Sequence, residues 1–140
     1  TNELQSVFGI VHFLVNTNHH RFIGSNSPKE RIIRGLKKVK LDNYFIEESI
    51  SSFDLVGKAK PAPDIYLRLI DLAKLDKEET IIIEDSAIGI QASVAAGVKV
   101  IGLTAGGHWY KGRSNQELFD AGAYEVVKNY EDMLLLINKL

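Results

Sequence analysis

The stretch Thr80-Ile81-Ile82-Ile83-Glu84-Asp85-Ser86 decides the fold. Its run of β-branched residues predicts a strand buried on both faces of a parallel sheet. Two carboxylates follow at once, although charge is costly to bury without a partner. Oxygen ligands at the carboxyl end of a strand suit Mg²⁺, so we predict a metal site at Asp85 and Glu84. The alternative is that Asp85 or Ser86 only caps the next helix.

Helical and strand periodicities alternate on both sides of this stretch. Helices are expected over residues 7–15, 28–39, 64–73, 87–96, 116–121 and 130–140. Strands are expected over residues 21–23, 45–50, 80–83, 98–103 and 124–127. The alternation implies right-handed crossovers and one parallel sheet with helices on both faces, a three-layer α/β/α Rossmann-like core. Ligands of such sheets bind at the carboxyl ends of the strands.

Ser25 follows the short strand Arg21-Phe22-Ile23 and precedes a helix. A hydroxyl there can donate to a phosphoryl oxygen, and the backbone amide of Asn26 lies near a helix start, where anions are favoured. The alternative is capping, because Ser27 suits the cap position and Pro28 the first helical position. The buried stripe of this helix is predicted to be Ile32, Ile33, Leu36 and Val39.

Lys60 stands in a loop, in the sequence Lys60-Pro61-Ala62-Pro63-Asp64. The two prolines stiffen the loop and disfavour helix just before each of them. A lysine held this way can neutralise a phosphate and keep a neighbouring carboxylate charged. The alternative is an ordinary solvated lysine, as Lys58 is expected to be. Asp64 is expected to cap the following helix.

His108 and Trp109 follow two glycines in a loop after a strand, so they could face the same end of the sheet. A substrate role for His108 is one reading of this placement. Ordinary loop placement explains both residues as well.

Size and composition restrict the function class. The chain has 140 residues, which suggests one domain over residues 1–140, with a net charge of −1 and no cysteine. There is no basic field for nucleic acid, no disulfide framework and no apolar run of membrane-spanning length. We therefore expect a cytoplasmic protein that binds neither nucleic acid nor membrane. The start at Thr1 reads as an interior point of a longer protein.

Taken together, these segments resemble the haloacid dehalogenase superfamily, and most closely its sugar-phosphate phosphatases and β-phosphoglucomutases. Ser25 matches the second family motif, Lys60 with its prolines the third, and Glu84-Asp85-Ser86 followed by Gly89 the fourth. Residues 103–123 look most like phosphatases for 6-phosphogluconate-type substrates. The resemblance covers nearly the whole chain, and three motifs in the right order are specific together.

The resemblance implies a mechanism. In the family an aspartate attacks the phosphoryl group and forms an aspartyl-phosphate, and a second aspartate two positions later acts as general acid and then base. Mg²⁺ clamps the nucleophile and the phosphate. By this resemblance Ser25 and Lys60 bind the phosphate of a small phosphorylated metabolite, Asp85 is a metal ligand, and Glu84 is its partner in the metal site.

The departure from the family lies in its first motif, Asp-x-Asp on the first strand. No two of the eight aspartates are separated by two positions, and the family's helical cap domain is also missing. Since the first strand is central in the family, its absence leaves two unpaired edges inside the sheet. We expect this chain alone to be inactive, with the missing segment on a separate peptide as one possibility. A phosphomutase core and an inert truncated binding module are the alternatives.

Overall fold

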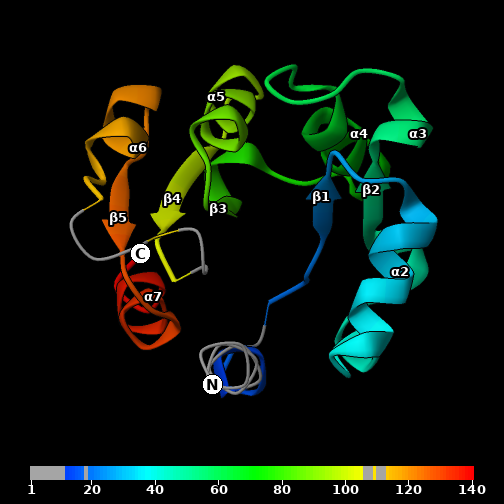
Figure 1. Ribbon diagram of the computed structural model, residues 1–140, viewed down its shortest axis with the longest axis horizontal. Coiled ribbons are helices and arrows are strands. Elements are labelled where there is room, and N and C mark those ends of the chain that lie inside the picture. Colours follow the sequence, from blue (N-terminus) through cyan, green and yellow to red (C-terminus); the bar gives the residue numbers. More distant parts are fainter. Residues whose placement is uncertain (1–11, 18, 106–108, 110–112) are drawn as a thin grey trace.

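A computed structural model describes residues 12–17, 19–105, 109 and 113–140, in which helices and strands alternate as the sequence predicts (Figure 1). The strands are β1 (Ile23–Ser25), β2 (Ile50–Ser52), β3 (Ile81–Glu84), β4 (Lys99–Leu103) and β5 (Glu125–Val127). The α-helices are α2 (Lys29–Lys38), α3 (Phe53–Val56), α4 (Asp64–Ala73), α5 (Ala87–Ala95), α6 (Gln116–Ala121) and α7 (Tyr130–Ile137), and residues 12–15 are also helical. Short 3₁₀ turns span Asp42–Tyr44, Glu47–Ser49 and Lys77–Glu79.

The strands form two parallel sheets instead of one. β1 pairs with β2, and β3, β4 and β5 pair in that order. β1 and β3 stand at the edges by which the two sheets face each other (Figure 1). Within the described part of the chain, neither of these two edges is paired. The expectation of two unpaired edges inside the sheet is therefore confirmed.

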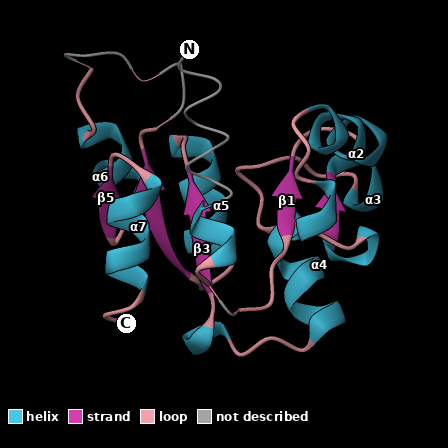
Figure 2. Cartoon of the chain, turned by 90° about the horizontal axis from the view of Figure 1, so that it is seen from below, coloured by secondary structure: helices cyan, strands magenta, loops and turns pink. Residues whose placement is uncertain are grey.

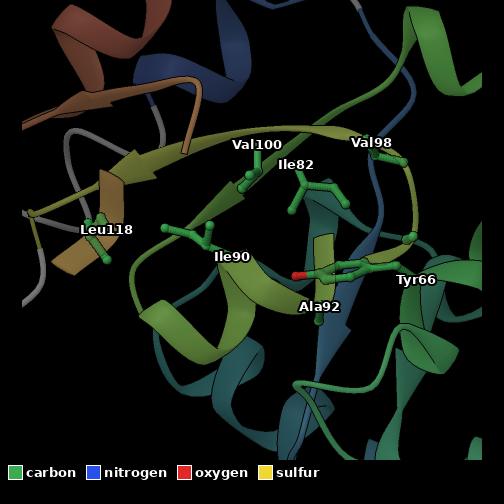
Figure 3. Packing of buried hydrophobic residues seen from close by; sticks show 8 residues of the cluster. Tyr66, Ile82, Ile90, Ala92, Val98, Val100 and Leu118 are labelled. Carbon is green, nitrogen blue, oxygen red and sulfur yellow. The ribbon is translucent and has the colours of Figure 1, made fainter. Parts of the chain in front are cut away.

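Helices cover both faces of the β3-β4-β5 sheet, which confirms the three-layer α/β/α arrangement (Figure 2). Ile82 and Val100 pack on one face with side chains of α4, α5 and α6 (Figure 3). Ile101 and Leu103 point to the other face, where they pack with Met133 of α7 and with residues of the 12–15 helix. The alternation follows from the period of two along a strand.

β3 is less fully buried than the isoleucine run predicts. Ile82 and Glu84 are buried, whereas Ile81 and Ile83 are only half-buried. The reason is its position at an edge of the described sheet.

The predicted cap of α2 is wrong. The helix begins at Lys29, and no side chain caps it from Pro28. Instead the Asp54 carboxylate accepts a hydrogen bond from the backbone N–H of Lys29 at 3.0 Å and one from the Ser52 hydroxyl at 2.6 Å. These two bonds, the Ser52 bond most of all, lower the pKa of the Asp54 carboxyl. Residues 25 positions apart form this cap, so local sequence does not reveal it.

Two further predictions in this region are wrong. The expected stripe on α2 is at most half-buried, and Val39 is exposed just beyond the helix end. The strand expected over residues 45–50 lies instead at Ile50–Ser52. Ser51 can occupy a buried strand because its hydroxyl donates to the carbonyl oxygen of Ile65 at 2.8 Å.

Helices α5 and α6 end near glycines, as the sequence predicts. Gly97 and Gly122 follow α5 and α6 with φ angles of +80° and +116°, the left-handed region that favours glycine. Asp64 is the first residue of α4 and makes no side-chain cap, so the cap expected of it is wrong.

Among the described residues, no helix combines the length and apolar character needed to cross a membrane.

Candidate functional site

Lys60 connects the two sheets. Its ammonium donates to the carbonyl oxygen of Gly24 in β1 at 2.8 Å and to Oε1 of Glu84 at the end of β3 at 2.6 Å. The side chains of Lys60 and Glu84 are only 10% and 8% exposed, so the ion pair is largely removed from water. A pair this buried needs close geometry and additional hydrogen bonds to offset its desolvation. The structure therefore brings the segments that contain Gly24, Lys60 and Glu84 together at one place.

The loop that carries Lys60 is fixed by Asn26. The Asn26 side chain accepts a hydrogen bond from the backbone N–H of Lys60 at 2.7 Å and donates to its carbonyl oxygen at 3.5 Å. The Lys60–Pro61 peptide bond is cis. The prediction singled out the backbone amide of Asn26 as a phosphate ligand, but it missed this link from the side chain to the Lys60 loop.

Ser25 ends β1, next to the Gly24 carbonyl that Lys60 contacts. Its Oγ accepts a hydrogen bond from the backbone N–H of Ser27 at 3.1 Å. This bond orients the hydroxyl and leaves its proton able to donate to another oxygen. Ser25 thus directly follows, along β1, the residue whose carbonyl oxygen the Lys60 ammonium contacts.

Glu84 has a second donor that the sequence analysis missed. The hydroxyl of Tyr66 on α4 donates to the same oxygen, Oε1, that Lys60 contacts. Burial, and then the charge of Glu84, raise the pKa of Tyr66, so the phenol stays protonated. The sequence analysis assigned no role to Tyr66, because no local pattern in the helix expected over residues 64–73 marks a tyrosine as the partner of a carboxylate.

Gly89 leaves the space that the Glu84 carboxylate fills. A Cβ built on Gly89 would lie 2.0 Å from Oε2 of Glu84. The sequence analysis singled out Gly89 as part of the fourth motif. Only the structure shows why a glycine is needed there, because the Glu84 carboxylate occupies the place of a side chain.

Asp85 is exposed at the end of β3, directly beside the buried Glu84. The indole N–H of Trp109 donates to the Asp85 carbonyl oxygen at 3.0 Å, and the Arg113 guanidinium lies over the Trp109 ring at 3.9 Å. This places Trp109 at the expected end of the sheet. His108 lies outside the described residues.

The start of α5 has the cap that was predicted as an alternative. The Ser86 hydroxyl accepts a hydrogen bond from the backbone N–H of Gly89 at 3.2 Å. Ser86, and not Asp85, is therefore the residue that caps α5.

Of the two carboxylates, Asp85 is the better suited to a hard cation. Mg²⁺ is commonly held by one or two carboxylates together with waters and substrate phosphate. Asp85 is exposed at the end of β3, whereas Oε1 of the buried Glu84 already accepts from Lys60 and Tyr66. In the described ranges, no group of three His, Cys, Asp or Glu side chains is placed to hold a metal. The donor set therefore fits Mg²⁺ only with further oxygens from elsewhere.

The sequence pattern of the haloacid dehalogenase-like hydrolases matches residues 1–103. The chain belongs to this family. The resemblance recognised from Ser25, Lys60 and the Glu84-Asp85 pair is thereby confirmed.

Curated relatives and solved structures give the same picture. A phosphorylated carbohydrates phosphatase of Thermotoga maritima is 27% identical over 115 residues, which are 81% of this chain and 50% of that protein. The 6-phosphogluconate phosphatase of Escherichia coli is 24% identical over 107 residues, 76% of this chain and 48% of that protein. The chain thus spans about half the length of the curated relatives it matches.

A haloacid dehalogenase-like protein of unknown function from Agrobacterium tumefaciens superimposes with a TM-score of 0.86 at 34% identity, covering 94% of this chain and 59% of that one. A putative β-phosphoglucomutase from Thermotoga maritima gives a TM-score of 0.78 at 24% identity, with 94% and 59% coverage, which shows the shared fold.

Proposed function

We propose that this chain is the carboxyl-terminal part of a Mg²⁺-dependent phosphatase core that hydrolyses a small phosphate ester, such as a sugar phosphate. The observation that carries the proposal is the position of Lys60, whose ammonium reaches β1 at Gly24 and β3 at Glu84. A cation at the carboxyl ends of parallel strands, beside a hydroxyl donor, suits the binding of a phosphoryl group.

Each candidate residue has a role in this proposal. Ser25 and Lys60 bind oxygens of the phosphoryl group and stabilise the charge that develops on them during transfer. Asp85 holds Mg²⁺, with Glu84 as its partner in the metal site. When bound, Mg²⁺ supplies positive charge that neutralises the phosphate. Asn26 keeps the Lys60 backbone in place.

The nucleophile of the proposed reaction comes from outside this chain. An aspartate on an additional strand would attack phosphorus, form an aspartyl-phosphate and release the alcohol of the ester, after which water releases phosphate. A strand that pairs with the facing edges of β1 and β3 would bring its carboxyl end next to Lys60. The supporting observations are these two edges, which are unpaired within the described residues, and the greater length of the relatives.

The phosphate site is tested by titrating the isolated chain with inorganic phosphate while the backbone amide signals of residues 25–27 are followed by NMR. Lys60→Met and Ser25→Ala should each weaken binding about tenfold or more, since each removes a donor to a charged group. Lys58→Met is the matched control, because Lys58 is an exposed lysine of the same loop. Equal losses in the Lys58 and Lys60 variants would contradict the assignment.

The location of the nucleophile is tested by activity. The 140-residue chain should show no Mg²⁺-dependent turnover of sugar phosphates or 6-phosphogluconate. Robust turnover by material whose intact mass matches the 140-residue chain would contradict the proposal.

A phosphomutase is the second candidate, favoured by the same three segments. Assay of a longer form of the protein on hexose 1-phosphates and on 6-phosphogluconate separates the two reactions. An inert binding module is the third candidate, and it predicts phosphate binding without turnover in any form of the protein.

A further inference from the structure

Tyr66 contacts all three segments that form the phosphate site. Its hydroxyl donates to Oε1 of Glu84, and the Lys60 ammonium lies over its ring at 4.8 Å from the centroid. A Cβ built on Gly24 would lie 2.7 Å from a ring carbon of Tyr66, so the ring packs closely against β1.

Tyr66 is buried, so water has little access to its hydroxyl. The residue is 7% exposed and belongs to the core cluster with Ile82 and Ala92 (Figure 3). Water cannot readily replace its hydrogen bond, and a buried carboxylate that loses a donor is costly. The phenol therefore sets the orientation of the Glu84 carboxylate.

The same oxygen of Glu84 accepts from Tyr66 and from Lys60. Two donors share its negative charge, so the phenol limits how strongly Glu84 attracts the ammonium. The ring face also attracts the ammonium, from the side of α4. Together these contacts hold Lys60 between Glu84 and the Gly24 carbonyl next to Ser25.

We propose that Tyr66 is a positioning residue of the phosphate site, which sets the Glu84 carboxylate through its hydroxyl and the Lys60 ammonium through its ring. The proposal rests on the proposed function, because it assumes that Lys60 binds a phosphoryl oxygen. It concerns the arrangement of this chain's own residues, so it can be tested without turnover.

The test uses Tyr66→Phe, which removes the hydroxyl and keeps the ring. The matched control is Tyr124→Phe, because Tyr124 also has a lysine over its ring, Lys99 at 4.2 Å, but is 55% exposed. Three quantities are measured: the NMR shifts of the Lys60 side-chain Cε and Hε, the Kd for inorganic phosphate, and the thermal midpoint.

The expected result is a change of the Lys60 shifts and a phosphate Kd raised about fivefold in Tyr66→Phe, less than for the loss of a direct donor to phosphate, because Tyr66 acts through Lys60 and Glu84. Tyr124→Phe should change neither quantity. A merely structural role would lower the thermal midpoint and leave both unchanged at temperatures where the protein is folded.

The outcomes separate the two proposals. If the Lys60 shifts of Tyr66→Phe equal those of the wild type, the positioning role is wrong. If the wild type binds phosphate, and in Tyr66→Phe these shifts move while the phosphate affinity does not, the positioning role is also wrong. If the wild type binds no phosphate while the Lys60 shifts move only in Tyr66→Phe, the proposed function fails and the positioning of Lys60 stands.

Discussion

Replacing Gly89 by alanine sets two physical effects against each other. Gly89 lies in the first turn of α5, where alanine is the better helix former by about 1 kcal/mol. The new Cβ, however, would lie 2.0 Å from Oε2 and 2.2 Å from Cδ of Glu84. Ordinary contacts begin near 3.5 Å, so the carboxylate must move by about 1.5 Å.

Glu84 cannot move that far without losing its partners. Tyr66 and Lys60 both donate to its Oε1, and each bond to a charged group stabilises the folded state by about 1.5 to 3 kcal/mol. After the gain in helix propensity, we expect Gly89→Ala to lower the free energy of unfolding by about 2 to 5 kcal/mol. That is a large part of the stability of a single domain.

The assay is urea unfolding followed by circular dichroism, with Gly35→Ala as the matched control. Gly35 lies in α2, and no atom lies within 4 Å of the Cβ that alanine would add. Gly35→Ala should therefore raise the free energy of unfolding by about 0.5 to 1 kcal/mol. The reasoning also predicts that Gly89→Ala becomes neutral or stabilising when Glu84 is replaced by alanine. A Gly89→Ala variant as stable as the Gly35 variant would refute the argument.

Three further predictions follow from the ion pair and the caps. Lys60→Met should lower the free energy of unfolding by about 3 kcal/mol, because it leaves Glu84 buried without its cation, and a change below 1 kcal/mol in urea unfolding would count against a buried pair. The Ser52 bond lowers the pKa of the Asp54 carboxyl, so the ionised Asp54 stabilises the fold fully at neutral pH and ceases to do so as the pH falls below about 4. Asp54→Asn should therefore narrow the difference between the urea midpoints at pH 7 and pH 3. An unchanged difference would contradict this expectation. Ser86→Ala should lower the free energy of unfolding by about 1 kcal/mol in the same assay through the lost cap of α5, and an unchanged free energy of unfolding would contradict the cap.

Much of the fold was predictable because its signals are local. The strand at Ile81–Glu84 and the helices α5 and α6 follow from β-branched runs, apolar periodicity and left-handed glycines. The order of Ser25, Lys60 and the Glu84-Asp85 pair was enough to predict one site, because parallel strands place their carboxyl ends at one edge.

The errors lie where distant residues decide. The cap of α2 comes from Asp54, and the buried Ser51 finds its partner at Ile65 in the next helix. Neither contact has a signature within a local window, so propensity alone favoured Ser27 and a strand over residues 45–50. Tyr66 was missed for a related reason, since its partner Glu84 lies 18 positions away in the chain.

The sequence by itself determined the alternation of strands and helices, the family and the residue types of the site, because these depend on local periodicity and on motif order. Only the tertiary structure decided that Lys60 links the two sheets through Gly24 and Glu84. It also decided that Tyr66 and Gly89 shape the surroundings of that carboxylate. The physical reason is that burial and hydrogen-bond partners are set by packing between residues far apart in the chain.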